Sequence, residues 1–134
     1  MIGGVLVKKK QKYVRPTDGE LEILRILWQL GPSGVGQVHK VHRAVKPITY
    51  NTTLKLMLIM HEKGLLKRDE SVRPQVYEAS VPEEELQRHL VWDLMQRAFG
   101  GSARKLVAAL TATKLGRAER QDIRQLLKEM EDEQ

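Results

Sequence analysis

Residues 49–55 place short polar side chains and a basic residue at the start of a predicted helix. Thr49, Asn51 and Thr52 carry hydroxyl and amide groups, and Lys55 follows them within one turn. Such groups can hydrogen-bond to base edges in the DNA major groove, which a helix contacts mainly through its N-terminal turn. One of them can also cap the helix, but together they exceed what a cap requires. These side chains therefore predict an edge that reads DNA sequence.

A second group of candidate DNA-binding residues follows this helix. Residues 65–71 and 74–80 alternate in polarity, and Ser71 and Pro74 suit a turn between them, so a two-stranded hairpin is predicted. The hairpin is expected to flank a DNA duplex and to bind its phosphates. The residues assigned to this role are Lys67, Arg68, Arg73 and Gln75.

Three helices must position these side chains. Thr17 and Glu20 form a capping box that starts the first helix. A stripe of valines within residues 35–45 predicts the second helix, and Pro47 separates it from the third, which is expected at about residues 49–63. Three helices followed by a hairpin are the elements of a winged helix-turn-helix.

The third helix is apolar over much of its surface. Its spacing predicts four core residues, which are Tyr50, Leu56, Met57 and Met60. The remaining large apolar residues, Leu54, Leu58 and Ile59, predict that its second half is buried beneath the hairpin and the first helix. Gly64 is expected to end it in a left-handed conformation.

Three further amphipathic helices are predicted after residue 82. Acidic residues 83–85 suit a first turn, Gly100-Gly101 interrupts the pattern, Ser102 can cap the next helix, and the last begins near Arg117. Together they are too small to enclose a core, so their apolar stripes are expected to pair with those of a second copy. The residues assigned to this dimer contact are Leu86, Leu90, Leu94, Met95, Leu106, Leu110, Ile123, Leu126 and Leu127.

The sequence thus predicts a mainly α protein with a small β-hairpin wing, in three parts. These are a basic arm (1–15), a winged helix-turn-helix domain (16–81) and a helical dimerisation domain (82–134). The arm either contacts phosphate or is disordered. The net charge is +6, and the positive excess lies within residues 1–80, which indicates a polyanion-binding part and a separate assembly part. A merely solvated basic surface would fit the charge equally well.

Several kinds of chemistry are excluded or disfavoured. The chain has no cysteine, which removes disulfides, thiol catalysis and cysteine-ligated metal. His39 and His42 lack a third ligand of evident spacing, so no metal site and no cofactor are expected. No nucleophile motif, phosphate loop or carboxylate pair indicates an enzyme. No apolar run is long enough to span a bilayer, and no secretory signal is evident, so a cytoplasmic protein without membrane insertion is expected.

The segment "YNTTLKLMLIMHEKGLLKRDESVRPQVYEA" resembles the recognition helix and wing of the BlaI/MecI penicillinase repressors. The stretch "PTDGELEILRILWQLGPSGVGQVHKVH" is similar to their first two helices, and "LMQRAFGGSARKLVAAL" to their C-terminal segment. The resemblance covers nearly everything from Pro16 onward. It implies a bacterial repressor that binds a double-stranded DNA operator as a homodimer, through an N-terminal winged helix and a C-terminal helical dimerisation domain.

The resemblance also implies a mechanism of release. In the best-known members of this family, a membrane sensor detects β-lactam and triggers cleavage of the repressor just before a phenylalanine. The matching bond in this sequence is Ala98–Phe99. Two alternatives stay open at this stage. Phe99 can be a core residue beside a glycine turn, and the chain can be a helical interaction protein that binds DNA or acidic partners without sequence preference.

Overall fold

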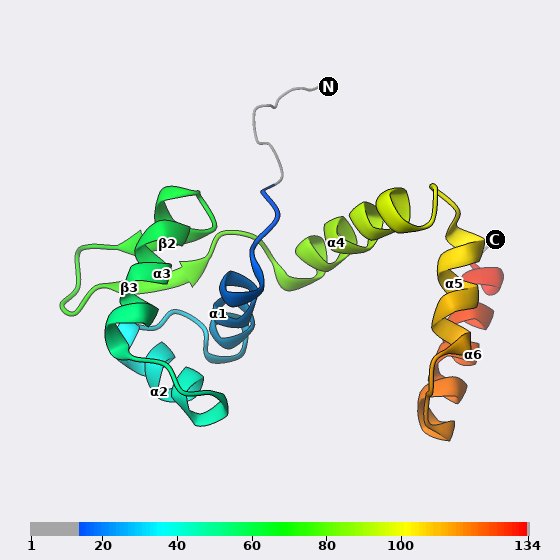
Figure 1. The fold of residues 1–134 in the computed structure, drawn as a ribbon, viewed down its shortest axis with the longest axis horizontal. Helices are drawn as coiled ribbons and strands as arrows, with labels where there is room; N and C mark the ends of the chain where they lie inside the picture. Colours follow the sequence, from blue (N-terminus) through cyan, green and yellow to red (C-terminus); the bar gives the residue numbers. More distant parts are fainter. Residues whose placement is uncertain (1–13, 134) are drawn as a thin grey trace. The chain divides into compact units, whose positions relative to one another are not determined.

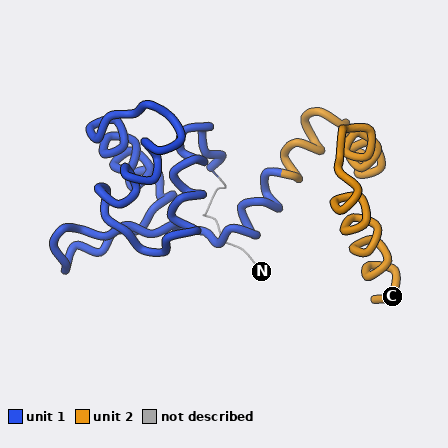
Figure 2. Tube along the Cα trace, turned by 90° about the horizontal axis from the view of Figure 1, so that it is seen from below, with its two compact units in different colours: residues 1–90 blue, residues 91–134 orange. Residues whose placement is uncertain are grey.

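The computed structural model describes residues 14–133, and these divide into two compact units on either side of the bond between Leu90 and Val91 (Figures 1 and 2). Residues 1–13, which make up most of the predicted basic arm, lie outside the described residues. Within residues 14–133 there are six helices and one two-stranded antiparallel sheet. The mainly α fold with a small hairpin, predicted from the sequence, is confirmed.

Unit 1 contains three helices, the hairpin and the start of a fourth helix. In chain order its elements are α1 (Asp18–Leu30), α2 (Val35–Val45), α3 (Tyr50–Glu62), β2 (Leu66–Asp69), β3 (Val76–Ala79) and the first half of α4 (Glu83–Ala98). The order of these elements is that of a winged helix-turn-helix, with β2 and β3 as the wing. Among the described residues, no helix has the length and apolar character needed to cross a membrane.

The predicted helix boundaries in unit 1 follow from local hydrogen bonds. The Thr17 amide donates to Glu20 Oε1 at 2.9 Å, and the Glu20 amide donates back to Thr17 Oγ1 at 3.2 Å, which completes the capping box of α1. Gly64 follows α3 with a φ of +85°, a left-handed conformation that glycine adopts without steric cost.

The Glu20 carboxylate links the start of α1 to the end of α3. Its side chain is 3% exposed, and Lys63 Nζ lies 2.8 Å from its Oε2. Burial by itself disfavours the charged form, but the hydrogen bonds from Lys63 and Thr17 outweigh it, so the pKa of Glu20 lies below its ordinary value. The charged pair therefore stabilises the packing of the first helix against the third.

The wing is anchored to the helices at its base. Strands β2 and β3 pair from Leu66 opposite Ala79 to Asp69 opposite Val76. Backbone hydrogen bonds of 2.8 and 2.9 Å also join Tyr77 to Ser33, which lies in the loop between α1 and α2. This second pairing fixes the direction in which the hairpin leaves the helical core.

The core of unit 1 is formed by apolar side chains from α1, α2, α3, the wing and α4. Its fully or almost fully buried members are Ile23, Leu24, Ile26, Leu27, Val35, Val38, Met57, Met60, Leu65, Leu66, Tyr77 and Leu86. Trp28 adds a hydrogen bond from Nε1 to the carbonyl of Val81 at 3.0 Å, which holds the segment before α4 against α1. Leu86, on α4, is 1% exposed and belongs to this core.

The structure corrects two details predicted for the third helix. Tyr50 was expected in the core, but it is 46% exposed because it lies at the first position of α3, before the buried stripe of Thr53, Met57 and Met60 begins. The second half of α3 is not buried all round either. Leu58 is 40% exposed and Ile59 is half-buried, because the wing and α1 cover only the opposite side of the helix.

Unit 2 contains the second half of α4, together with α5 (Ala103–Ala112) and α6 (Arg117–Asp132). Ser102 caps α5, accepting a hydrogen bond from the Lys105 amide at 3.0 Å, as the sequence predicts. No residue of α5 or α6 is buried. The boundary between a DNA-binding domain and a dimerisation domain at residue 82 stays a prediction. The compact units of the structure divide after Leu90.

Candidate nucleic-acid interface

The side of α3 opposite the core presents the polar residues assigned to sequence reading. Thr53, Met57 and Met60 occupy its buried side, whereas Asn51 and Lys55 are exposed. The turns of an α-helix place residues four apart on the same face, so Asn51 and Lys55 form one exposed edge. Such an edge can approach base edges while the apolar side of the helix stays in the protein core.

Thr49 and Thr52 form the N-terminal cap of α3. The Thr52 amide donates to Thr49 Oγ1 at 3.1 Å, and the two hydroxyl oxygens lie 2.9 Å apart. Thr49 is therefore the N-cap, and its hydroxyl is already engaged within the helix. Thr52 is exposed, so its hydroxyl can also meet a ligand.

Two shallow recesses lie beside this edge and share Thr52 and Leu56. One is lined by Asn51, Thr52, Lys55, Leu56 and Ile59. The other lies between the end of α2 and the start of α3 and is lined by Arg43, Lys46, Pro47, Ile48, Thr49, Thr52 and Leu56. Sequence reasoning did not assign Arg43 and Lys46 to the interface. The signal available was a pair of basic residues near the end of the second helix, Arg43 and, directly before Pro47, Lys46.

The segment between α2 and α3 is held by His39. His39 Nε2 donates to the carbonyl of Ile48 at 3.0 Å, and its ring meets that of Tyr50 edge to face, with the centroids 5.7 Å apart. His39 therefore fixes the residues that immediately precede the reading edge. The exposed Tyr50 completes this contact, which explains an aromatic residue at the first position of α3.

His42 connects α2 to α1. It is 1% exposed, and its Nε2 lies 2.9 Å from Glu22 Oε1, the same oxygen that Lys46 Nζ approaches at 2.9 Å. The hydrogen bonds from Lys46 and then His42 lower the pKa of Glu22. Among residues 14–133 no group of three potential metal ligands is found, and both histidines have these structural partners.

The wing carries acidic residues next to its basic ones. Arg68 donates from Nε and from a terminal nitrogen to Glu70 Oε2 at 3.0 and 2.8 Å, and its guanidinium lies 6.0 Å from the Tyr77 ring centroid. The interaction with the Tyr77 side chain, followed by that with Glu70, raises the pKa of Arg68. Arg68 is thus already paired within the protein.

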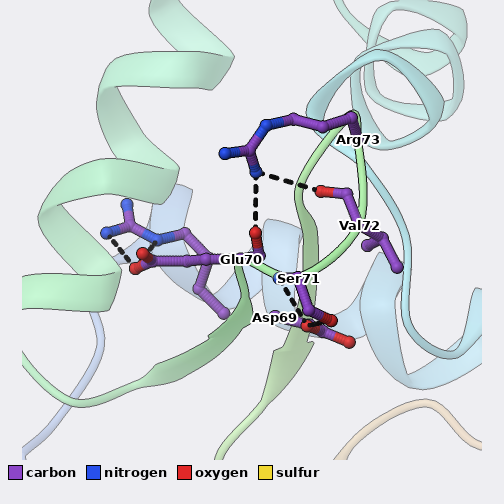
Figure 3. Close-up of polar contacts among 6 residues, drawn as sticks. Asp69, Glu70, Ser71, Val72 and Arg73 are labelled. Carbon is purple, nitrogen blue, oxygen red and sulfur yellow. Dashed lines mark hydrogen bonds and ion pairs between the residues drawn. The ribbon is translucent and has the colours of Figure 1, made fainter.

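The tip of the wing is ordered by its own hydrogen bonds (Figure 3). Arg73 donates to the carbonyls of Glu70 and Val72 at 2.7 and 3.3 Å, and Ser71 donates to the Asp69 carboxylate through its amide and its hydroxyl. The hydrogen bonds from the Ser71 hydroxyl and then the Ser71 amide lower the pKa of Asp69. Of the four residues assigned to phosphate binding, Lys67 is exposed and Gln75 is half-buried.

The profile of one protein family, described as the penicillinase repressor family, matches residues 16–129. The chain belongs to the penicillinase repressor family. The search of curated proteins found no match to the chain. This is a family of DNA-binding transcriptional regulators and not of enzymes. The residues of α3 and the wing predict the DNA binding.

The C-terminal residues of this penicillinase repressor family member differ widely in exposure. Leu86 is buried within unit 1, and Leu90 packs against the same core. The other residues assigned to the dimer contact are half-buried (Met95, Leu106, Ile123) or 44–59% exposed (Leu94, Leu110, Leu126, Leu127). A recess between α5 and α6 is lined by Thr111, Leu115, Arg120, Ile123, Arg124 and Leu127.

The bond proposed for cleavage lies at the end of α4. Ala98 is the last residue of the helix and is exposed, whereas Phe99 is half-buried. Gly100 and Gly101 follow with φ values of +59° and +82°, and the Gly101 amide donates to the carbonyl of Met95 at 2.9 Å. The glycines therefore form the turn that ends α4.

Proposed function

We propose that this chain is a repressor that binds a pseudo-palindromic operator as a homodimer, with α3 of each copy in the major groove. The observation that carries the proposal is the exposed edge of Asn51, Thr52 and Lys55 on a helix whose opposite side is locked into the core. In a two-fold complex, the two reading helices would be separated by about one DNA helical turn, ~34 Å, or a multiple of it.

Footprinting on the DNA upstream of the chain's own gene tests sequence-specific binding. Protection of a two-fold symmetric site, at concentrations that leave random DNA unprotected, is the expected result. Equal protection of all sequences would instead support a basic interaction protein that binds DNA or acidic partners without sequence preference.

The homodimer is proposed to form through unit 2. Leu94, Leu110, Leu126 and Leu127 expose much of their apolar surface in a single chain, and no side chain of α5 or α6 is buried. Apolar area of this kind is removed from water when a second copy covers it. Light scattering at micromolar concentration is expected to give twice the mass of one chain. A single-chain mass would contradict the proposal.

Release from DNA is proposed to follow cleavage at Ala98–Phe99, through a membrane sensor-protease that responds to a β-lactam-type signal. Cleavage would separate the reading unit from most of unit 2, so the two half-sites would no longer be bound as a tethered pair. The exposed end of α4 and the glycine turn after it support local opening for a protease.

The test is co-expression with a metalloprotease encoded in the neighbouring genes, followed by mass spectrometry of the fragments. Cleavage between Ala98 and Phe99, with loss of operator binding, is the expected result. An intact chain under conditions that lift repression would show that another signal controls it.

A further inference from the structure

The reading side of α3 is not purely polar. Leu54 and Leu56 pack against the core of unit 1, and Met57 and Met60 belong to it. Among the described apolar side chains of α3, Leu58 and Ile59 take no part in that packing. Part of the apolar surface of this helix therefore lies outside the core of unit 1.

Ile59 lies in the same recess as the polar residues of the reading edge. Asn51, Thr52 and Lys55 line one part of that recess, and Leu56 and Ile59 line the rest. Asn51, Lys55 and Ile59 follow one another at intervals of four residues, so they share one side of α3. At a rise of about 1.5 Å per residue, Asn51 and Ile59 are ~12 Å apart along the helix axis.

This arrangement of amide and aliphatic groups has a counterpart in the major groove. Adenine presents an acceptor and a donor that an asparagine amide can meet, whereas thymine presents a carbonyl oxygen and a C5-methyl group. The methyl group is the one apolar feature of the major-groove base edges, and an aliphatic side chain is its complement. A distance of ~12 Å corresponds to about three to four base-pair steps of roughly 3.4 Å.

We propose that Ile59 is a specificity-determining residue that contacts the C5-methyl group of a thymine, several base pairs from the bases met by Asn51. The inference rests on the proposed function, because it takes α3 as the helix that enters the major groove. It adds to that function the chemical identity of one base pair in each half-site, which is A·T with its thymine methyl facing Ile59.

The test begins with a site selected from random DNA by the full-length chain. Each thymine of that site is then replaced singly by deoxyuridine, which removes the methyl group and keeps every hydrogen-bonding group. Loss of one buried methyl contact corresponds to about a fourfold weaker affinity. One position per half-site is expected to show this loss, and the other thymines are expected to show less.

The variant Ile59→Ala links that loss to this side chain. It should bind the thymine and deoxyuridine forms of the site with equal affinity, so the fourfold ratio should fall to one. Leu30→Ala is the matched control, because Leu30 is 46% exposed at the end of α1 and lies outside α3. That variant should retain the fourfold ratio.

Three outcomes would overturn the inference, and they separate it from the proposed function. If wild-type protein selects a site but no deoxyuridine replacement weakens binding, the thymine contact is wrong and sequence-specific binding stands. If Ile59→Ala keeps the fourfold ratio, a different side chain contacts the methyl group. If no site is selected at all, the proposed function itself fails. The wild-type measurement remains decisive even where Ile59→Ala folds poorly.

Discussion

The two units of the chain use apolar residues in opposite ways. Unit 1 encloses a core in which Leu24, Met57 and Met60 are completely buried, and buried polar side chains such as Glu20 and His42 have partners from other helices. In unit 2, neither α5 nor α6 has a buried residue, and Leu126 and Met130 are each 59% exposed. The comparison indicates that unit 1 is stabilised by its own contacts, whereas unit 2 leaves much of its apolar surface in contact with water.

The largest effect, on association and operator affinity, is expected when charged residues replace exposed leucines of α6 in unit 2. The double variant Leu126→Glu/Leu127→Glu should be monomeric, because burial of unpaired carboxylates in an apolar contact is strongly unfavourable. Operator affinity should fall by about 10² to 10⁴-fold with the loss of tethered half-sites. Sedimentation and gel-shift assays measure the two effects. The control is Gln125→Glu, an exposed position on the same helix, and an unchanged dimer in the double variant would reject this role for α6.

The second effect concerns the stability of unit 1. Met57→Ala removes a side chain that is 0% exposed and should lower the free energy of unfolding by about 2–5 kcal/mol. Urea denaturation followed by circular dichroism measures the change. The loss should be the same at low and high protein concentration if unit 1 unfolds independently of the dimer. By contrast, the effect of Leu127→Ala should depend on concentration, because it acts on association.

The third effect separates base reading from phosphate binding within unit 1. Asn51→Ala should cost about 1–3 kcal/mol on the selected site and little on random DNA. Lys67→Ala should weaken both alike and reduce the salt slope by about one. Arg68→Ala should have a smaller effect than Lys67→Ala, because Arg68 must leave Glu70 before it can meet a phosphate. Equal losses for Asn51→Ala on both DNAs would show that the reading edge lies elsewhere.

The smallest effect is the pH dependence of unit 1. Glu20 and Glu22 have folded-state pKa values below the ordinary 4.5, so their contribution to stability is present above pH 4.5 and is lost as the pH falls through the folded values. Glu22→Gln should therefore flatten the acid side of the stability curve. Thermal unfolding from pH 7 to pH 3 tests this. If Glu22→Gln and the wild type lost stability equally at acid pH, ionisation of Glu22 would not govern that loss.

The sequence allowed prediction of features that depend on neighbouring residues. Thr17 and Glu20 are three residues apart and form the capping box, and Gly64 takes the left-handed conformation expected after α3. The order of helices and hairpin followed from periodicity and breakers in the same way. In these cases the residues that decide the structure lie close together in the sequence.

Features that depend on distant contacts could not be predicted. The pairing of Glu22 with His42 joins residues twenty positions apart. Leu86 belongs to the same apolar stripe as Leu94, yet Leu86 packs into unit 1 and Leu94 does not, because Trp28 holds the segment at Val81 against α1. On the wing, the basic residues were evident, but the engagement of Arg68 with Glu70 and Tyr77 depends on side-chain geometry across the hairpin.

The hydrogen bond from Trp28 to Val81 also has an optical consequence. The chain has two tryptophans, and they lie in different units and different surroundings. Trp28 is half-buried and bonded to a backbone carbonyl, whereas Trp92 is 61% exposed to water. Indole emission shifts to shorter wavelength when water is removed from the ring. Trp28 therefore serves as an intrinsic fluorophore for the unfolding of unit 1, and Trp92 as one for events that cover the second half of α4.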